Sequence, residues 1–215
     1  MNTNVIGKKE WWEDRLNKLE KSHSFNLGYK LLCCPWKTIE DATHAFISLN
    51  PGAATPVDAQ IRCTSEERGN SYFIERYTTR SPITEQYIKL IELLAINPNK
   101  VLTGYAHPFR SAAWSDFNSV EKDAGLELGV DFWKMVLDQG RIKTVIITGS
   151  DLSKTFVDRM GAHQETQIPS GWNPTSLTKH RTDKNIEIIS LPHLSRFKLL
   201  SRANCYEPLR EIFSI

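Results

Sequence analysis

The feature of this chain that most constrains its fold is a set of short apolar runs, separated from one another by segments with helical periodicity. Runs of four to six residues that are apolar throughout are typical of strands buried on both faces of a parallel sheet. Four such strands are expected: HAFISLN at about 44–49, a run at about Lys100–Thr103, TVIIT at 144–148 and IEIISL at 186–191.

Helices are predicted where apolar side chains recur every three or four residues. They are expected at 8–21, at about Thr84–Ala95 with Thr84 as N-cap, at 127–139, at 151–160 with Ser150 or Asp151 as N-cap, and at about 203–213. The polar segments 53–82 and 163–184 show little periodicity, and we expect loops there. A loop as long as 53–82 inside a compact domain is usually functional.

Strands that alternate with helices form right-handed βαβ units and a mainly parallel sheet. We therefore predict an α/β protein: a three-layer α/β/α domain with a central, mostly parallel four-stranded sheet. Residues 1–215 are expected to form a single domain, with an N-terminal helical extension at about 1–40.

The composition sets the broad class of protein without naming a partner. The chain has 27 basic and 25 acidic residues, and a net charge of +2 does not by itself imply nucleic-acid binding. No apolar run reaches the roughly 18 residues of a membrane helix. No apolar segment follows the N-terminal lysines as in a secretory signal, so we expect a cytoplasmic protein. Basic residues gather late in the chain: Lys179, His180, Arg181, Lys184, Arg196, Lys198 and Arg202.

The cysteines give no sign of a metal site. None of the four belongs to a C-x-x-C pair, and two adjacent cysteines cannot easily supply two ligands to one tetrahedral metal. We interpret them as reduced, mostly buried thiols and expect no metal and no cofactor. They are Cys33, Cys34, Cys63 and Cys205.

Ligands of open parallel sheets bind outside the carboxyl ends of the strands. The segments that follow the four predicted strands are 50–54, 104–110, 149–151 and 192–197, and all four carry polar or turn residues. A functional site is therefore expected where these segments meet. No glycine-rich phosphate loop is present, which disfavours an unrelated nucleotide-binding α/β protein.

Two of these segments carry a family resemblance. The sequence SLNPG at 48–52 resembles the first motif of the uracil-DNA glycosylase superfamily, in the Asn-Pro-Gly form of its mismatch-specific branches. LPHLSRF at 191–197 is similar to the second motif, a His-Pro-Ser type sequence after the last strand. Each motif alone is weak, because an NPG turn can simply end a strand. Together, and in this order, the two motifs carry a resemblance that spans roughly residues 44–213.

The resemblance implies that Asn50 and His193 are the catalytic residues. Cleavage of an N-glycosidic bond builds positive charge on the sugar and negative charge on the base. Asn50 would hold a water below the anomeric carbon, less effectively than an aspartate base would. His193 would donate a hydrogen bond to a carbonyl oxygen of the base. A histidine in isolation is more often structural than catalytic, and this alternative stays open.

DNA contacts are expected from the second motif and from the segment after the second strand. Ser195 and neighbouring backbone amides would bind a phosphate, with help from Arg196. Phe197 would fill the gap that a flipped base leaves, although an isolated phenylalanine is more often part of the core. Arg110 is a further candidate for DNA binding.

The predicted base pocket departs from the family pattern. Tyr105 stands nearest the position of the asparagine that reads the base in many relatives, and Gly52 replaces a bulky tyrosine that closes the pocket against the 5-position. If the alignment with the family were off by one residue, neither of these two differences would hold. Phe73 is the first choice for the aromatic that stacks on the base, and Tyr72 the second.

We therefore expect a monofunctional DNA glycosylase that flips a modified pyrimidine out of DNA and leaves an abasic site. Some members of the superfamily excise glucosylated hydroxymethylcytosine from phage DNA, and the open pocket is compatible with that antiviral role. One alternative is a repair enzyme for uracil or mismatched thymine. Another is a catalytically idle, nucleic-acid-binding relative. DNA is the expected partner, with no membrane and no obligate protein partner.

Overall fold

The structure is a computed structural model, and it describes residues 8–52, 61–78 and 81–215. Part of the predicted loop 53–82, at 53–60 and 79–80, lies outside the described residues. The α-helices are α2 Lys9–Ser22, α3 Ser71–Glu75, α4 Pro82–Leu93, α5 Ser119–Asp138, α6 Ser150–Met160 and α7 Tyr206–Phe213. Helix α3 and the short strand β3 (Arg62–Cys63) show that the predicted loop also contains regular structure.

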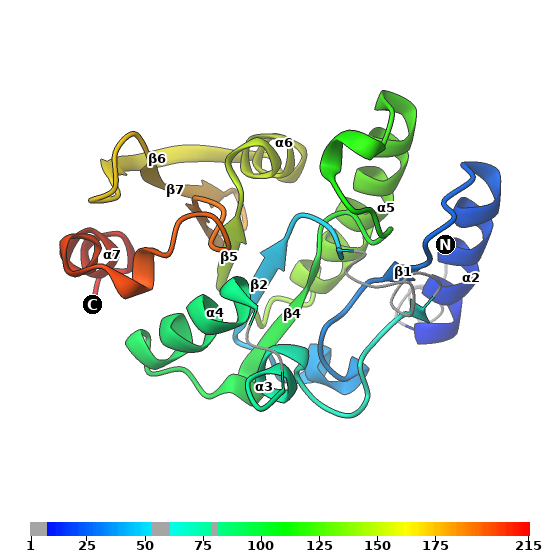
Figure 1. Ribbon diagram of the computed structural model, residues 1–215, viewed down its shortest axis with the longest axis horizontal. Coiled ribbons are helices and arrows are strands. Elements are labelled where there is room, and N and C mark those ends of the chain that lie inside the picture. Colours follow the sequence, from blue (N-terminus) through cyan, green and yellow to red (C-terminus); the bar gives the residue numbers. More distant parts are fainter. Residues whose placement is uncertain (1–7, 53–60, 79–80) are drawn as a thin grey trace.

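The described residues form a six-stranded sheet in the order β4-β2-β5-β8-β7-β6 (Figure 1). The strands are β2 His44–Ser48, β4 Val101–Tyr105, β5 Thr144–Thr148, β6 Ala162–Pro169, β7 Ser176–Thr182 and β8 Glu187–Leu191. Neighbours among β4, β2, β5 and β8 pair in parallel, which confirms the four predicted strands. A short second sheet pairs β1 (Tyr29–Lys30) with β3.

The prediction of a four-stranded sheet is wrong, because the segment 163–184 forms the antiparallel hairpin β6–β7 instead of a loop. Strand β6 is an edge strand with mostly exposed side chains, so its sequence AHQETQIP lacks the apolar run of a buried strand. In β7, Leu177 is fully buried while its neighbours are half-buried. A prediction based on apolar runs therefore assigns such polar strands to loops.

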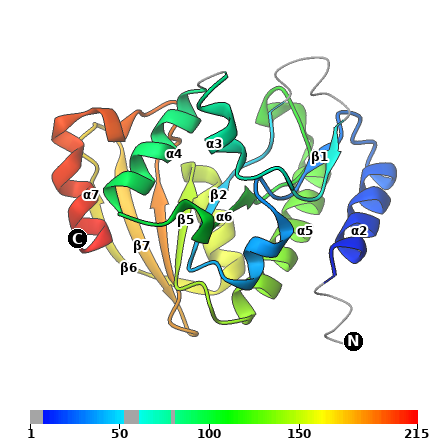
Figure 2. The ribbon, with the colours of Figure 1, turned by 90° about the horizontal axis from the view of Figure 1, so that it is seen from below.

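The parallel strands are buried on both faces by helices. Ala45 and Ile47 of β2 join the core cluster under α2, α5 and α6, whereas Phe46 between them joins the cluster under α3, α4 and α7. This alternation follows from the two-residue period of a strand. Figure 2 is seen from the side of α3 and α4, with α5 and α6 behind the sheet. The α/β class is therefore confirmed, with helices on both sides.

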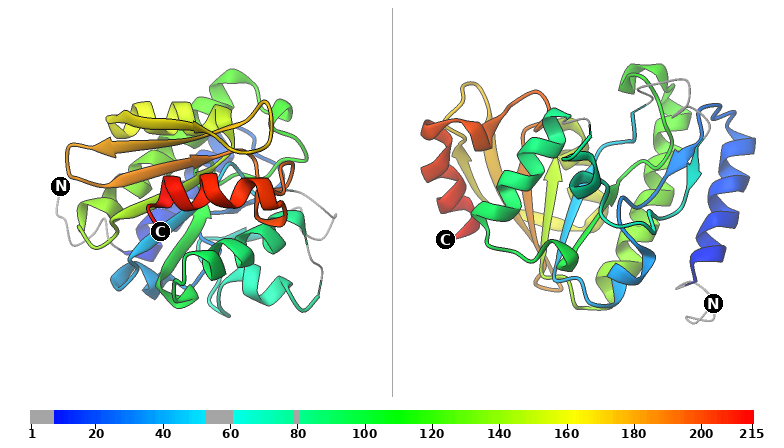
Figure 3. Two further views of the ribbon diagram at one scale, coloured as in Figure 1. Left: turned by 90° about the vertical axis from the view of Figure 1, so that its left-hand side faces the viewer. Right: turned by 60° about the horizontal axis from the view of Figure 1, so that its bottom comes forward.

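The hairpin β6–β7 lies between α6 on one side and α7 on the other (Figure 3, left). At the opposite end of the molecule, α2 stands beside α5 (Figure 3, right). Trp12 and Leu16 of α2 are fully buried, and the Trp12 ring meets Phe132 of α5 edge-on at 5.2 Å. The N-terminal helix thus contributes to the same core as the sheet.

Several helix starts differ from the predicted ones. Helix α4 is capped by Ser81, whose Oγ accepts the backbone N–H of Thr84, so Thr84 is not the N-cap. Helix α6 follows Gly149 at the cap position in place of Ser150 or Asp151. Helix α5 begins at Ser119, well before residue 127, because Asn118 forms a capping box with a later glutamate. Polar residues in its first turns hide this start from the apolar pattern.

Candidate functional site

The first motif forms the turn that follows β2. The amide nitrogen Nδ2 of Asn50 donates to Oγ of Ser111 at 2.8 Å and to the Pro51 carbonyl oxygen at 3.2 Å. These bonds fix the orientation of the half-buried amide. Oδ1 is then the atom of Asn50 that can accept a hydrogen bond from a water molecule.

The segment after β4 runs alongside this turn and holds it. Backbone N–H groups of residues 106, 107 and 111 donate to the carbonyl oxygens of Ser48, Leu49 and Pro51 at 2.9, 2.9 and 3.3 Å. Ser111, which is 3% exposed, therefore contacts the first motif through both backbone and side chain. Sequence reasoning missed Ser111. The available signal was its place in the segment that follows the second strand.

Arg110 lies on the same turn. Its Nη1 donates to the Gly52 carbonyl oxygen at 2.9 Å, and its Nε donates to the Ile61 carbonyl oxygen at 3.4 Å. The guanidinium group thus binds protein carbonyls on both sides of the segment 53–60. An isolated bridge also pairs Gly52 with Ser111.

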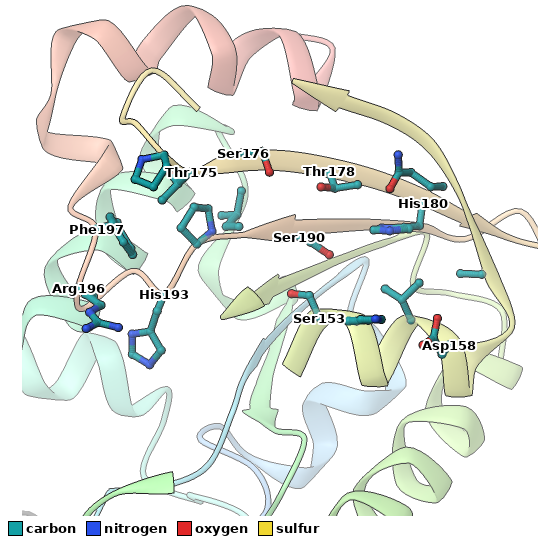
Figure 4. A pocket seen from close by; sticks show the side chains of 17 residues that line it. Ser153, Asp158, Thr175, Ser176, Thr178, His180, Ser190, His193, Arg196 and Phe197 are labelled. Atoms are coloured by element: carbon teal, nitrogen blue, oxygen red, sulfur yellow. The ribbon is translucent and has the colours of Figure 1, made fainter. Parts of the chain in front are cut away.

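The second motif forms a tight turn after β8 (Figure 4). The backbone N–H groups of Arg196 and Phe197 both donate to the His193 carbonyl oxygen, at 2.9 and 2.8 Å. Leu194 is fully buried, and its N–H donates to Oγ1 of Thr148 at the end of β5 at 3.1 Å. This anchor fixes the turn to the neighbouring strand.

The imidazole of His193 is oriented by the same turn. Nδ1 of His193 and Oγ of Ser195 are 2.7 Å apart, which leaves Nε2 at the other edge of the ring for a further partner. Burial lowers the pKa of His193, and the nearby positive charge of Arg196 lowers it further. The ring is therefore neutral at pH 7. If Ser195 donates to Nδ1, then Nε2 carries the proton and is a hydrogen-bond donor.

A cavity of about 500 Å³ lies beside this histidine. Seven residues from the two motifs, α6 and the segment after β4 line it: Leu49, Trp114, Gly149, Leu152, His193, Ser195 and Arg196. Leu49 belongs to the first motif and precedes Asn50, which is not itself a lining residue of this cavity. The cavity therefore touches both motifs.

The spacing of the strands explains why the motifs meet. Strands β2 and β8 both pair with β5, so they are separated by one strand and lie about 10 Å apart. Both end at the same edge of the sheet because all three are parallel. The turns that carry Asn50 and His193 are thus placed at one edge, as the expected site requires.

The aromatic residues predicted for the base pocket lie in the layer of α3 and α4. The hydroxyl of Tyr72 hydrogen-bonds with Oγ of Ser48 at 3.2 Å, and Phe73 meets the Tyr87 ring edge-on at 6.1 Å. Tyr105, at the end of β4, packs against the same core cluster. Among the described residues, these three are not brought into the cavity beside His193.

Trp114 is the aromatic residue that lines this cavity. Its ring is held edge-on against His107 at 5.2 Å and against Phe117 at 5.6 Å. Sequence reasoning missed Trp114 because it lies several residues beyond the segment that directly follows the second strand.

Gly52 is not crowded by any residue that the structure describes. A Cβ atom added there would meet no heavy atom of the described residues within 4 Å. Gly52 is also absent from the glycines of the described chain that have positive φ. A side chain at this position is therefore compatible with the local backbone.

Phe197 and Arg202 both contact Trp172. The rings of Phe197 and Trp172 meet edge-on at 5.7 Å, and Cζ of Arg202 lies 3.3 Å from the centre of the Trp172 ring. Phe197 is half-buried by this contact, whereas Arg196 and Lys198 beside it are exposed.

The late basic residues separate into two groups. Lys179 and Arg181 both pair with Glu187, and Lys184 pairs with Asp138. These cations lie along the hairpin and the start of β8, and acidic partners neutralise them. Arg196 and Lys198 belong instead to the second motif and the residue after it, and no ion pair involves them within the described part of the chain.

Within the described ranges, no group of three or more histidine, cysteine, aspartate or glutamate side chains is arranged to hold a metal ion. The thiols of Cys33, Cys34 and Cys205 are buried, that of Cys63 is half-buried, and all four are free. None of the helices in the part of the chain that the structure describes is long and apolar enough to cross a membrane.

Comparison with known proteins assigns no family. No model of a protein family matches the chain, and no curated protein matches its sequence.

Proposed function

We propose that this protein is a monofunctional DNA glycosylase, which flips a pyrimidine out of DNA and hydrolyses its N-glycosidic bond. The observation that carries the proposal is the cavity at the carboxyl edge of the sheet. It joins the first-motif turn, through Leu49, to the oriented imidazole of His193. Two motif-like segments that are about 140 residues apart in sequence share one site there.

In this proposal His193 stabilises the departing base. As the N-glycosidic bond breaks, its electron pair moves onto the base, and negative charge develops on a base carbonyl oxygen. Nε2–H of the neutral His193 would donate to that oxygen while Ser195 holds Nδ1. A preorganised donor of this kind contributes ~3–4 kcal/mol of transition-state stabilisation.

Asn50 would position the water that attacks the sugar. Its Nδ2 is held by Ser111, so Oδ1 can accept a hydrogen bond from the water. The water oxygen bonds to the anomeric carbon and becomes the hydroxyl of the abasic sugar, and its proton leaves to solvent or to the departing base. An amide is a weak base, so Asn50 acts mainly by positioning.

The DNA backbone would be bound at the second motif. Arg196 and Lys198 are exposed cations beside the His193 turn and would contact phosphates, which position DNA without reading its sequence. The Ser195 hydroxyl, expected to contact a phosphate, lies against His193 and would orient the imidazole instead. Phe197 remains a candidate to fill the gap in the base stack.

The open space at Gly52 favours a pyrimidine with a bulky 5-substituent as substrate, such as the glucosylated hydroxymethylcytosine of phage DNA. A cytoplasmic enzyme of this kind would act in antiviral defence. Trp114 is the candidate to contact the base, because its residue lines the cavity beside His193, whereas Phe73 and Tyr105 do not line it.

The proposal is tested by incubating the protein with duplexes that each contain one candidate base, followed by detection of abasic sites. The panel contains uracil opposite guanine, thymine opposite guanine, and glucosylated hydroxymethylcytosine. We expect abasic sites in the third duplex above all. Cleavage of only the first two would identify a repair enzyme, and tight binding without any abasic site would identify an inactive DNA-binding relative.

A further inference from the structure

A second cavity, the α6 groove, lies between α6 and the strands β7 and β8 (Figure 4). It measures about 690 Å³, a size that is typical of small-molecule sites. One end of the α6 groove reaches His193, Arg196 and Phe197, and the other end reaches Asp158 near the end of α6.

The floor of the α6 groove is polar. Ser176, Thr178 and His180 are alternate residues of β7 and therefore share one face of the strand. Ser190 of β8 pairs with Thr178 and lines the same floor. The opposite face of β7 carries the fully buried Leu177 together with Lys179 and Arg181, both of which pair with Glu187.

Two polar atoms of this floor lack a partner. Oγ of Ser190 and Nδ1 of His180 are both buried and make no hydrogen bond with the residues that the structure describes. Ser190 is only 7% exposed, and it lines the groove. Buried polar groups are ordinarily hydrogen-bonded, and an exception calls for an explanation such as a bound ligand.

The hydrogen-bonding character of the floor is mixed. Burial lowers the pKa of His180, so its neutral ring offers one nitrogen as a donor and the other as an acceptor. The hydroxyls of Ser190 and Thr178 can both donate and accept. A matching ligand must therefore offer several groups that do both.

The lining of the α6 groove carries charges of both signs. Lys154 and Asp158 of α6 line it, and so does Arg196 of the second motif, which gives two positive charges and one negative charge. Phe197 adds an apolar surface at the end near His193. A sugar combines clustered hydroxyl groups, which match the serine, threonine and histidine side chains of the floor, with an apolar C–H face.

We infer that the α6 groove is a binding site for a sugar ring. The sugar can come from two sources: a free saccharide, or a sugar attached to a base of DNA. The second source rests on the proposed function, whereas the first does not. The groove residues Thr178 and Ser190 have no part in the proposed excision chemistry, so binding and excision can be tested separately.

The test is a titration with methyl glucoside, followed through backbone amide signals in heteronuclear NMR spectra. Saturable shifts are expected for Ser176, Thr178 and Ser190. The double variant Thr178→Val/Ser190→Ala removes two hydroxyls that would bond the sugar, so its affinity is expected to fall at least tenfold. The matched control, Ser119→Ala at the exposed start of α5, should bind as the wild type does.

Thermal unfolding separates binding from folding. Because the Ser190 hydroxyl has no partner among the described residues, Ser190→Ala alone is expected to unfold at the same or a higher temperature while it binds the glucoside more weakly. Weaker binding by a variant that is fully stable supports the sugar site. Unchanged binding by both Ser190→Ala and the double variant would overturn it.

Further titrations distinguish the sources of the sugar. They use an unmodified duplex, the same duplex with glucosylated hydroxymethylcytosine, and inorganic phosphate. Groove shifts with free methyl glucoside indicate a free-sugar site, and shifts with the modified duplex alone indicate a sugar carried by DNA. Groove shifts with phosphate, or with none of the probes, would refute the proposal. All of these measurements detect binding, so their results remain valid even if the protein excises no base.

Discussion

Asn50 and His193 are each held by a serine, and their proposed roles predict a specific pattern of loss. Asn50→Ala and His193→Ala should each lower single-turnover excision by ~10²–10³, because each removes a positioned group from the transition state. DNA affinity should fall far less, since phosphate contacts supply most of it. Single-turnover rates and binding isotherms make the comparison. If a variant excises at nearly the wild-type rate, the residue that was replaced has no part in the mechanism.

Gly52 is the residue that decides the proposed preference for a bulky base. Gly52→Tyr should fold, because its Cβ meets no described heavy atom within 4 Å and its φ is not positive. The new ring should exclude a 5-substituted pyrimidine by steric clash and leave uracil excision less affected. Excision of uracil and of glucosylated hydroxymethylcytosine is compared in both proteins. If the wild type excises uracil and no 5-modified base, the proposed pocket is wrong.

At the residue scale, sequence reasoning found the positions that directly follow a strand. Asn50 and His193 could be chosen because two motif-like segments directly follow recognisable strands. Ser111 and Trp114 were missed because they lie just beyond the segment 104–110, and their contacts with the site depend on the path of the chain after β4. The packing of Tyr72 and Phe73 depends likewise on α3, which the polar sequence before it concealed.

The contact of α5 with the segment after β4 yields a prediction for a whole element. A Cβ at Gly129 would lie 1.7 Å from the Ala106 carbonyl oxygen, so Gly129→Ala must push α5 away from this segment. Overpacking costs ~1–3 kcal/mol, and better helix propensity offsets at most ~1 kcal/mol. Urea unfolding should show a net loss of stability, and excision should fall because the shifted segment carries Ser111.

Glu127→Ala is the matched control, because residue 127 lies on the exposed face of the same helix. It should change the free energy of unfolding by less than ~0.5 kcal/mol. Equal stability of Gly129→Ala and the wild type would show that α5 does not depend on this close approach.

At the scale of elements, the four parallel strands were predictable because burial on both faces demands continuous apolar runs. The hairpin β6–β7 was not predictable in this way, since an edge strand and its half-covered neighbour tolerate polar residues. The order of the strands in the sheet depends on long-range pairing, which no single segment of sequence specifies.

The whole molecule should lose stability in mild acid because of a buried histidine. His107 is fully buried, and burial lowers its pKa from the ordinary 6.5 to about 4. Between these values the unfolded chain binds more protons than the folded protein, so the free energy of unfolding falls as the pH drops from 6.5 to 4. The difference between these two pKa values corresponds to roughly 3 kcal/mol.

Urea unfolding at several pH values tests this prediction. His107→Phe keeps an aromatic ring among Phe25, Trp114 and Phe117 and should remove most of the slope. A residual slope of the same sign is expected, because burial lowers the pKa of His44 and of His193 as well. Identical slopes in the variant and the wild type would contradict the assignment to His107.

The central claim is that this protein releases a free base from DNA at the site of Asn50 and His193. Mass spectrometry of the small molecules released from phage-modified and uracil-containing duplexes tests it most directly. The wild type should release an intact pyrimidine in amounts equal to the abasic sites formed, and the double variant Asn50→Ala/His193→Ala should release none above background. No released base from any duplex, or equal release by the double variant, would contradict the claim.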